Sequence, residues 1–281
     1  MSSQTLRKKL TVFVGMNFLL TCFSAIAGDV SAFQSTKPLA RVEYWQQRQN
    51  QIEQVLLDRP TLSKVKLLFL GDSITDFWQM GEDPWVKKQW HGGKIWSESF
   101  TGARAENSSL NFGISGDRTE HILYRIQPKK EGGLGELDSQ DLHPEYVIIM
   151  LGINNSWAPE DPAADSIFQG VRAVVQAVME RKPKANIILE SILPTNDPDK
   201  NANVVKPVNK RLKGLAESAE FSGKIAYLDL YPAFTDKAGR QIANYFVKDG
   251  LHPNENGYRV WRDQLIPFLA ADRKRRSSKA H

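Results

Sequence analysis

The chain has 281 residues, of which 41% are hydrophobic and 25% are charged. This is the composition of an ordinary globular protein, and it excludes collagen-like, coiled-coil and wholly disordered chains. The formal net charge of +5 comes from the two ends, because residues 7–9 carry three positive charges and residues 273–279 carry five. The stretch between them has a net charge of −3. We therefore expect no nucleic acid as a partner of the folded body.

The amino terminus has the pattern of a secretory signal peptide. Basic residues 7–9 precede an apolar run, and the small-residue sequence A-I-A then ends at Ala27. We expect residues 1–27 to be a signal peptide cut after Ala27, which leaves a secreted or periplasmic protein; the alternative is an uncleaved membrane anchor. No later segment is long and apolar enough to cross a bilayer. The only cysteine, Cys22, lies in this leader, so the mature chain would have no disulfide and no thiol nucleophile.

The rest of the chain divides into three parts. Residues 28–60 form a polar extension with a helix expected over 41–57, and residues 272–281 are expected to be a basic, disordered tail. Between them, residues 61–271 form one domain, in which short apolar runs alternate with helical periodicity. The runs, each expected to be a buried strand, are Val65–Leu70, Ser109–Phe112, Tyr146–Leu151, Asn186–Ser191 and Ile225–Leu230. Helices are expected over 165–181, 203–219 and 255–269, the last interrupted by Pro267. This alternation predicts a parallel sheet with helices on both faces.

A serine stands directly after the first predicted strand, in Gly71-Asp72-Ser73-Ile74. Ligands of parallel α/β sheets bind outside the carboxyl ends of the strands, so Ser73 lies at the edge where a site is expected. Two interpretations are open. Ser73 is either the N-cap of the next helix or an exposed nucleophile.

One of the five histidines stands out as a candidate base for that serine. His252 lies in a loop before the last predicted helix, and Asp249 precedes it by three residues. A carboxylate at that distance can reach the imidazole from the same turn and fix its tautomer. The alternative is an ordinary Asp-Gly turn with a histidine at the surface.

Two further loops could supply hydrogen-bond donors to an oxyanion. Residues 111–117, N-F-G-I-S-G-D, follow the second strand and contain two glycines. Residues 151–155, L-G-I-N-N, end the third strand and place an asparagine amide at the same edge. Each asparagine could also be a simple turn residue.

Taken in order, these four blocks resemble the SGNH (GDSL) hydrolase family, and most closely its platelet-activating-factor acetylhydrolase catalytic-subunit branch. The resemblance covers about residues 64–269. It implies a flavodoxin-like, three-layer α/β/α sandwich with about five parallel strands, and an SGNH hydrolase domain over residues 61–271. The G-x-S-x-G elbow of the standard α/β-hydrolases does not occur in the sequence.

The resemblance also implies a role for each matching residue. Ser73 corresponds to the nucleophile, His252 to the general base, and Asp249 to the residue that orients His252. The oxyanion donors correspond to the Ser73 N–H, the Gly116 N–H and the Asn154 amide, with Gly113 as the alternative to Gly116. Asp72 and Asn155, which lie within these blocks, and Trp78, which follows the first of them, are candidate substrate contacts.

The segment from Trp78 to Ser97 departs from the branch. It contains four tryptophans, at positions 78, 85, 90 and 96, and it looks longer than the corresponding loop of compact relatives. The tryptophans are either a platform for sugar rings or local packing. From this loop and the leader, we expect the substrate to be an acylated carbohydrate outside the cytoplasm.

The sequence therefore predicts a secreted or periplasmic serine esterase that hydrolyses short O-acyl esters, with an acylated carbohydrate as substrate and no metal or organic cofactor. The alternatives are a lysophospholipase or thioesterase, or a short-chain lipid acetylhydrolase, with the same triad. A further alternative is a glycan-binding protein without catalysis on the same scaffold.

Overall fold

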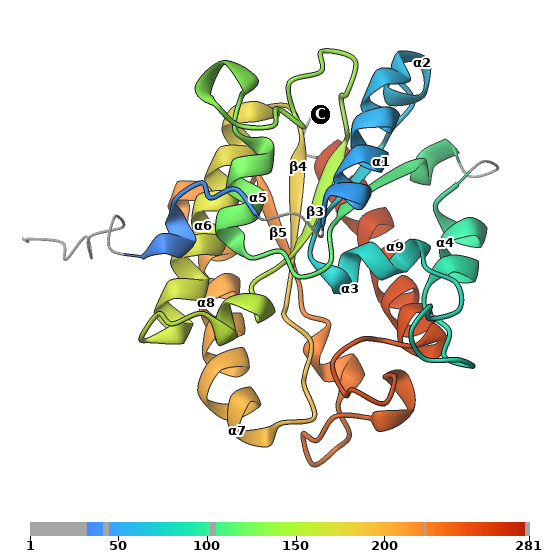
Figure 1. The fold of residues 1–281 in the computed structure, drawn as a ribbon, viewed down its shortest axis with the longest axis vertical. Coiled ribbons are helices and arrows are strands. Elements are labelled where there is room, and N and C mark those ends of the chain that lie inside the picture. The colour runs from blue at the N-terminus through green and yellow to red at the C-terminus, as the bar shows by residue number, and fades with distance from the viewer. Residues whose placement is uncertain (1–32, 42–44, 102–104, 222, 279–281) are drawn as a thin grey trace, which may run out of the picture.

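A computed structural model describes residues 33–41, 45–101, 105–221 and 223–278 of the chain. Its centre is a sheet of five parallel strands in the order β2-β1-β3-β4-β5 (Figure 1). The strands are β1 (Leu67–Gly71), β2 (Ser109–Gly113), β3 (Tyr146–Met150), β4 (Asn186–Glu190) and β5 (Ile225–Leu228). All five expected strands are confirmed, and each lies within two residues of its predicted bounds.

The two central strands explain why the apolar runs are continuous. Every residue of β1 and β3 is buried, because helices cover both faces of the sheet. The edge strand β2 differs, since its first two residues are only half-buried. The sequence pattern thus reflects burial on both faces of the sheet rather than alternation between core and solvent.

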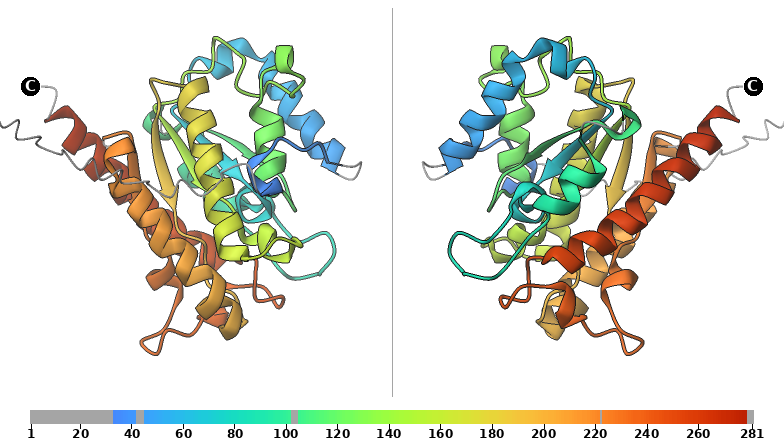
Figure 2. Two further views of the ribbon diagram at one scale, coloured as in Figure 1. Left: turned by 90° about the vertical axis from the view of Figure 1, so that its left-hand side faces the viewer. Right: turned by 90° about the vertical axis from the view of Figure 1, so that its right-hand side faces the viewer.

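Helices form one layer on each face, which confirms the three-layer α/β/α architecture. The chain reverses its direction across the sheet after β2, because β1 lies between β2 and β3. Right-handed crossovers then place α4 (Gly93–Ser99) on one face and α5 (Thr119–Ile126), α6 (Ala163–Arg181) and α8 (Lys206–Glu217) on the other. The final helix α9 (Glu255–Ser277) packs against α4, and α6 packs against both α5 and α8. Figure 2 shows α6 and α9 on opposite sides of the strands.

The polar extension packs onto this domain through helix α1 (Gln46–Leu57). Ile52 of this helix is buried in the core, and Arg48 donates hydrogen bonds to the carbonyl oxygens of Asn111 and Gly113. The extension is therefore tied to the carboxyl end of β2. The remaining short helices are α2 (Arg59–Leu62), α3 (Ser73–Asp76), α7 (Pro198–Lys200) and a π-helical turn (Asn201–Val205).

The carboxyl-terminal region corrects the expected disordered tail. Helix α9 continues through Pro267 to Ser277. Asp272 is buried and accepts a hydrogen bond of 2.9 Å from the hydroxyl of Tyr146, and Arg273 forms an ion pair of 2.9 Å with Glu145. These tertiary contacts hold the helix beyond the proline, although proline removes one backbone hydrogen bond. Only residues 279–281 of the predicted tail lie outside the described residues.

Within the residues that the structure describes, no helix has both the length and the apolar character needed to cross a bilayer. The expected signal peptide, residues 1–27, lies outside those residues.

Candidate active site

The predicted site lies at the carboxyl edge of β1, where the strand order reverses. The loops that follow β2 and β3 lie on either side of β1, since Gly71 is in register with both Gly113 and Met150. Gly71 also allows the next turn to fold back tightly. A Cβ atom at this position would lie 2.1 Å from Thr75 Oγ1 and 2.5 Å from the carbonyl oxygen of Met150. The carboxyl edge of the sheet at a change in strand order is the usual binding position in open α/β sheets.

Asp72, rather than Ser73, caps the short helix α3. Its Oδ1 accepts a hydrogen bond of 3.0 Å from the backbone N–H of Ile74. Burial raises the pKa of the Asp72 carboxyl to about 7, although the Ile74 N–H and the nearby His252 oppose the shift. The interpretation of Ser73 as a helix cap is therefore wrong, and its hydroxyl is left for another partner.

That partner is His252, in a row of three side chains. Ser73 Oγ lies 2.8 Å from His252 Nε2, and Nδ1 of the same ring lies 2.6 Å from Asp249 Oδ2. Because the carboxylate accepts from Nδ1–H, Nε2 is the nitrogen that can accept the serine proton. The Phe77 ring packs on the imidazole with 4.9 Å between the ring centroids. This geometry is that of a hydroxyl nucleophile next to an oriented base.

Asp249 is held by its own turn. Its Oδ1 accepts the backbone N–H groups of Leu251 and His252 at 2.8 and 3.0 Å. The next residue, Gly250, has a φ of +67°, which favours glycine. Asn196, in the loop after β4, supports the turn, since its backbone N–H donates to the Gly250 carbonyl oxygen and its amide to that of Asp249. This role of Asn196 was not predicted.

The loop after β2 separates the two candidate glycines. The N–H of Gly113 donates to Asn111 Oδ1 at 2.8 Å, and a Cβ on Gly113 would lie 2.2 Å from the backbone nitrogen of Asp76. Gly113 is therefore enclosed where β2 packs against α3, and its N–H already has an acceptor. Gly116 has a φ of +80°, and its N–H donates to no acceptor in the described part of the chain. Of the two, Gly116 is the one whose N–H can serve a ligand.

Asn154 lies in the 3-10 turn that follows β3. Its amide nitrogen donates one hydrogen bond of 2.8 Å to the carbonyl oxygen of Asp117, at the end of the Gly116 loop. An amide has two N–H groups, so one remains for a second acceptor. The contact joins the two loops that flank Ser73.

A buried charge network beneath these loops was not predicted. Arg125 is 1% exposed, and it pairs with Asp117 at 2.6 Å and with Glu136 through both carboxylate oxygens at 2.9 Å. It also donates to the carbonyl oxygen of Phe112 at 2.6 Å, while Arg41 donates to Asp117 at 2.8 Å. These bonds fix the start and the end of the loop that holds Gly116. A bidentate arginine–carboxylate pair is among the strongest of such contacts.

Two of the expected substrate contacts are corrected by burial. Trp78 is fully buried among other rings, with Tyr258 and Trp261 at centroid distances of 4.7 and 4.8 Å. Asn155 is also fully buried, and its amide nitrogen donates to Thr119 Oγ1 and Glu120 Oε2. Asp72, the third candidate, is 1% exposed and serves as the cap described above. All three are buried in the core.

The four tryptophans of segment 78–97 divide into two pairs. Trp78 and Trp96 belong to the aromatic core, which corresponds to the packing interpretation. Trp85 and Trp90 are 74% and 53% exposed. Only the second pair is available to a ligand.

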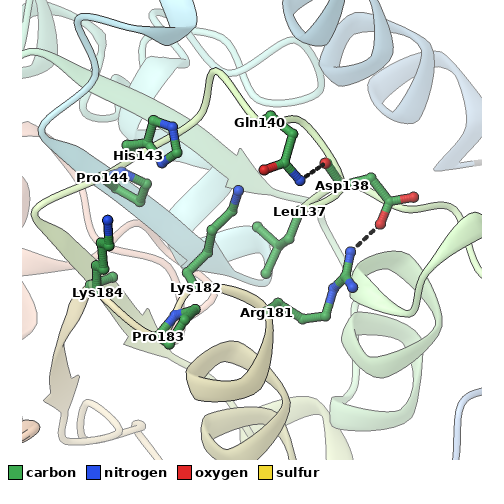
Figure 3. A pocket seen from close by; sticks show the side chains of 10 residues that line it. Leu137, Asp138, Gln140, His143, Pro144, Arg181, Lys182, Pro183 and Lys184 are labelled. Carbon is green, nitrogen blue, oxygen red and sulfur yellow. Dashed lines mark hydrogen bonds and ion pairs between the residues drawn. The ribbon is translucent and has the colours of Figure 1, made fainter.

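A cavity of about 620 Å³ lies far from this constellation, near the amino ends of β3 and β4 (Figure 3). Arg181 pairs there with Asp138, and the Lys182 amine donates to the carbonyl oxygen of Ser139 at 2.8 Å. Burial, followed by the charge of Arg181, lowers the pKa of Lys182 to about 8. The lining has no hydroxyl or thiol side chain, so we do not place the ester chemistry in this cavity.

Metal ligation is also not indicated by side-chain grouping. Across the described ranges, no three histidine, cysteine, aspartate or glutamate side chains are placed to hold an ion together. The chemistry that this arrangement offers is that of a serine, a base and nearby N–H donors.

Comparison with known proteins agrees with the sequence blocks. Residues 69–260 match the profile of the GDSL-like lipase/acylhydrolase family. The alpha1 subunit of platelet-activating factor acetylhydrolase IB from Pongo abelii is 30% identical over 212 residues, which cover 74% of this chain and 78% of that subunit. The similarity read from the four sequence blocks is thereby confirmed.

Two solved structures share the fold. An inferred acylhydrolase from Bacteroides fragilis has a TM-score of 0.57 and 20% identity, over 83% of this chain and 99% of that one. A carbohydrate esterase family 3 protein from Talaromyces cellulolyticus has a TM-score of 0.51 and 24% identity, over 74% of this chain and 97% of that one. At this identity the likeness concerns the fold.

Proposed function

Because the chain belongs to the GDSL-like lipase/acylhydrolase family and is thus an ester hydrolase, we propose that it is a serine esterase that removes acetyl groups from carbohydrates outside the cytoplasm. The observation that carries the proposal is the row of hydrogen bonds from Ser73 through His252 to Asp249. A protein that only binds glycans has no need of this row. The glycan-binding alternative without catalysis is therefore set aside.

The geometry defines the order of the steps. Ser73 Oγ attacks the ester carbonyl carbon while His252 Nε2 takes the hydroxyl proton, and Asp249 stabilises the resulting imidazolium. The oxyanion of the tetrahedral intermediate accepts hydrogen bonds from the N–H groups of Ser73 and Gly116 and from the second N–H of the Asn154 amide. His252 then gives its proton to the departing alcohol, which leaves an acyl-enzyme on Ser73.

Water completes the reaction. His252 Nε2 removes a proton from a water molecule, and the resulting hydroxide attacks the acyl carbon. A second tetrahedral intermediate forms against the same donors. It collapses to release the carboxylic acid, and Ser73 Oγ recovers its proton from His252.

Two observations support the substrate class. The relative that is 30% identical is named as an acetylhydrolase subunit, and this name supports a short acyl group in the substrate of this chain. The exposed ring of Trp85 on the 78–97 segment supports a carbohydrate as the alcohol, because an aromatic face suits a ring with one apolar side. The leader pattern at residues 7–27 supports export. The same relatives support a lipid acetyl ester as the second candidate.

One assay separates the two candidates. Purified protein is incubated with acetylated xylooligosaccharides and, separately, with vesicles containing a phospholipid that has an acetyl group at its second position, and acetate release is measured. We expect faster release from the oligosaccharide, and none from either substrate with Ser73→Ala. If acetate is released faster from the lipid, the lipid acetyl ester and not the carbohydrate is the substrate. Activity that survives in Ser73→Ala would overturn the assigned nucleophile.

A further inference from the structure

The most exposed aromatic ring near the triad is Trp85. Trp85 is 74% exposed, yet its ring lies 6.5 Å from the Phe77 ring. Phe77 in turn packs on the imidazoles of His91 and His252, each at 4.9 Å. Trp85 is thus separated from the proposed base by a single aromatic side chain. A large apolar side chain left in solvent at this position is available to a ligand.

The backbone of Trp85 is held by the carboxylate of Asp83, which is itself held by His91. Asp83 Oδ1 accepts the N–H groups of Trp85 and Val86 at 2.8 and 2.9 Å, and its Oδ2 bonds to His91 Nε2 at 3.1 Å. Burial opposes ionisation of Asp83, but the hydrogen bonds from His91 and the two N–H groups outweigh it and lower the pKa of the carboxyl. The arrangement repeats that of Asp249, which also uses one oxygen for its turn and the other for an imidazole.

The second ring nitrogen of His91 bonds to the loop that contains Asp249 and His252. His91 is buried, and its Nδ1 bonds at 3.0 Å to the carbonyl oxygen of Pro253, the residue that follows His252. The two partners of the ring are the carboxylate of Asp83 on one side and the carbonyl oxygen of Pro253 on the other. A continuous chain of hydrogen bonds thus runs from the backbone of Trp85 to the neighbour of the proposed base.

The two residues before His91 attach to the same loop. The side-chain oxygen of Gln89 accepts the N–H of Lys248 at 3.1 Å, and the Trp90 carbonyl oxygen accepts the N–H of Glu255 at 2.9 Å. Residues 89–91 therefore attach the segment 78–97 to both ends of the loop that contains Asp249 and His252. This segment is a fixed wall of the site.

We propose that Trp85 is the platform on which the sugar ring of an O-acetylated oligosaccharide stacks while its ester lies at Ser73, and that Asp83 and His91 are the positioning residues of this platform. This inference rests on the proposed function and names the subsite for the alcohol. Near Trp85 in the sequence, Val86 is also exposed, and the exposed charges of Glu82, Lys87 and Lys88 border this small apolar face. Such a face suits a sugar ring with hydroxyls at its edge and does not enclose an acyl chain. The two lysines oppose a cationic headgroup.

The test compares two acetate esters that differ in the alcohol. Acetate release is measured from acetylated xylotriose and from ethyl acetate, whose alcohol is too small to reach Trp85. For Trp85→Ala we expect KM for acetylated xylotriose to rise about tenfold, because the stacking area is lost. We expect kcat to change little, and kcat/KM for ethyl acetate to remain that of the wild type. Trp85→Tyr, which keeps an aromatic face, is expected to recover most of the loss.

Trp90→Ala is the matched control, because it removes an exposed tryptophan of the same loop whose ring does not pack on Phe77. It is expected to leave both substrates unchanged. Binding is also followed without turnover, by the tryptophan fluorescence of Ser73→Ala on addition of acetylated xylotriose. That signal is expected to be lost in the double variant Ser73→Ala/Trp85→Ala.

Different failures have different meanings. If the wild type cleaves acetylated xylotriose and Trp85→Ala does so with unchanged KM, the platform is overturned while the proposed function stands. Equal losses on both esters would also overturn the platform. If the wild type cleaves ethyl acetate but not acetylated xylotriose, the carbohydrate function itself fails, and the platform fails with it.

Discussion

Asp249 and His252 share one turn, and the carboxylate uses its two oxygens for different tasks. One oxygen lies 2.6 Å from the imidazole Nδ1, and the other accepts two backbone N–H groups of the same turn. Burial alone would raise the pKa of Asp249, but these three hydrogen bonds outweigh it and lower the pKa to about 2. The carboxylate therefore remains ionised well into the acidic range and keeps its hydrogen bond to the imidazole.

The first prediction concerns Asp249→Asn. The amide oxygen can still accept the two backbone N–H groups, so the turn should keep its shape. The amide NH2 group then faces Nδ1 and favours the tautomer with the proton on Nε2, which cannot accept the Ser73 proton. We expect kcat to fall by roughly 10⁴-fold with little change in Tm. A kcat within tenfold of the wild type would contradict the assigned role of Asp249.

The second prediction concerns Asn154, which joins the two loops beside Ser73. If its second N–H meets the oxyanion, Asn154→Ala should lower kcat by about 10²–10³ and leave KM nearly unchanged. Asn155→Ala is the matched control, because its amide is fully buried and bonds only within the core. That variant should lose about 1–3 kcal/mol of unfolding free energy while its folded fraction keeps its kcat. If Asn154→Ala lowers only stability while Asn155→Ala lowers kcat, Asn154 does not bind the oxyanion.

Much of the fold and of the triad follows from local sequence. The five strands are continuous apolar runs ended by glycine, proline or a polar residue, and burial on both faces of the sheet enforces that pattern. Ser73 is predicted from its position at the carboxyl end of the first strand, and Asp249 and His252 from their three-residue spacing and the family resemblance. The choice between Gly113 and Gly116 needed the structure, because it depends on which N–H the Asn111 side chain takes.

The remaining features depend on contacts between distant parts of the chain. Nothing in the neighbourhood of Trp78 or Trp85 tells which ring packs in the core and which is exposed. Helix α9 passes Pro267 because Asp272 and Arg273 bond to the β3 region, 126 or more residues away. The Arg125 network is hidden for the same reason, since arginine and glutamate in a helix and a loop normally indicate solvent-exposed surface.

The third prediction concerns that network. Arg125→Met keeps much of the side-chain volume but leaves the buried carboxylates of Asp117 and Glu136 without this partner. We expect the free energy of unfolding to fall by about 3–5 kcal/mol. Arg172→Met is the control, because its pair with Glu220 is partly exposed, and it should change stability by about 0–1 kcal/mol. Urea unfolding curves measure both. Equal small effects would show that the network contributes nothing beyond a surface pair.

The last prediction concerns Glu190, at the end of β4. Its side chain is 1% exposed, one oxygen accepts the Trp261 indole N–H at 2.8 Å, and the other has no partner among the described residues. Burial raises the pKa of this carboxyl to about 8. A pKa raised by folding means that the folded state holds the proton more tightly than the unfolded chain does. The stabilising contribution is therefore complete below the unfolded pKa of about 4.5 and is lost as the pH rises through about 8.

Glu190→Gln tests this directly, because glutamine keeps an acceptor for Trp261 and stays neutral at every pH. Between about pH 5 and 8 the stability of the wild type should fall with pH by up to ~1.4 kcal/mol per unit more than that of the variant. The two proteins should differ least near pH 4, and the variant should be the more stable above neutral pH. Asp72, whose pKa is also raised, to about 7, is present in both proteins and leaves a common residual slope. Urea unfolding across this range gives the two slopes, and identical slopes would mean that Glu190 is ionised in the folded protein despite its burial.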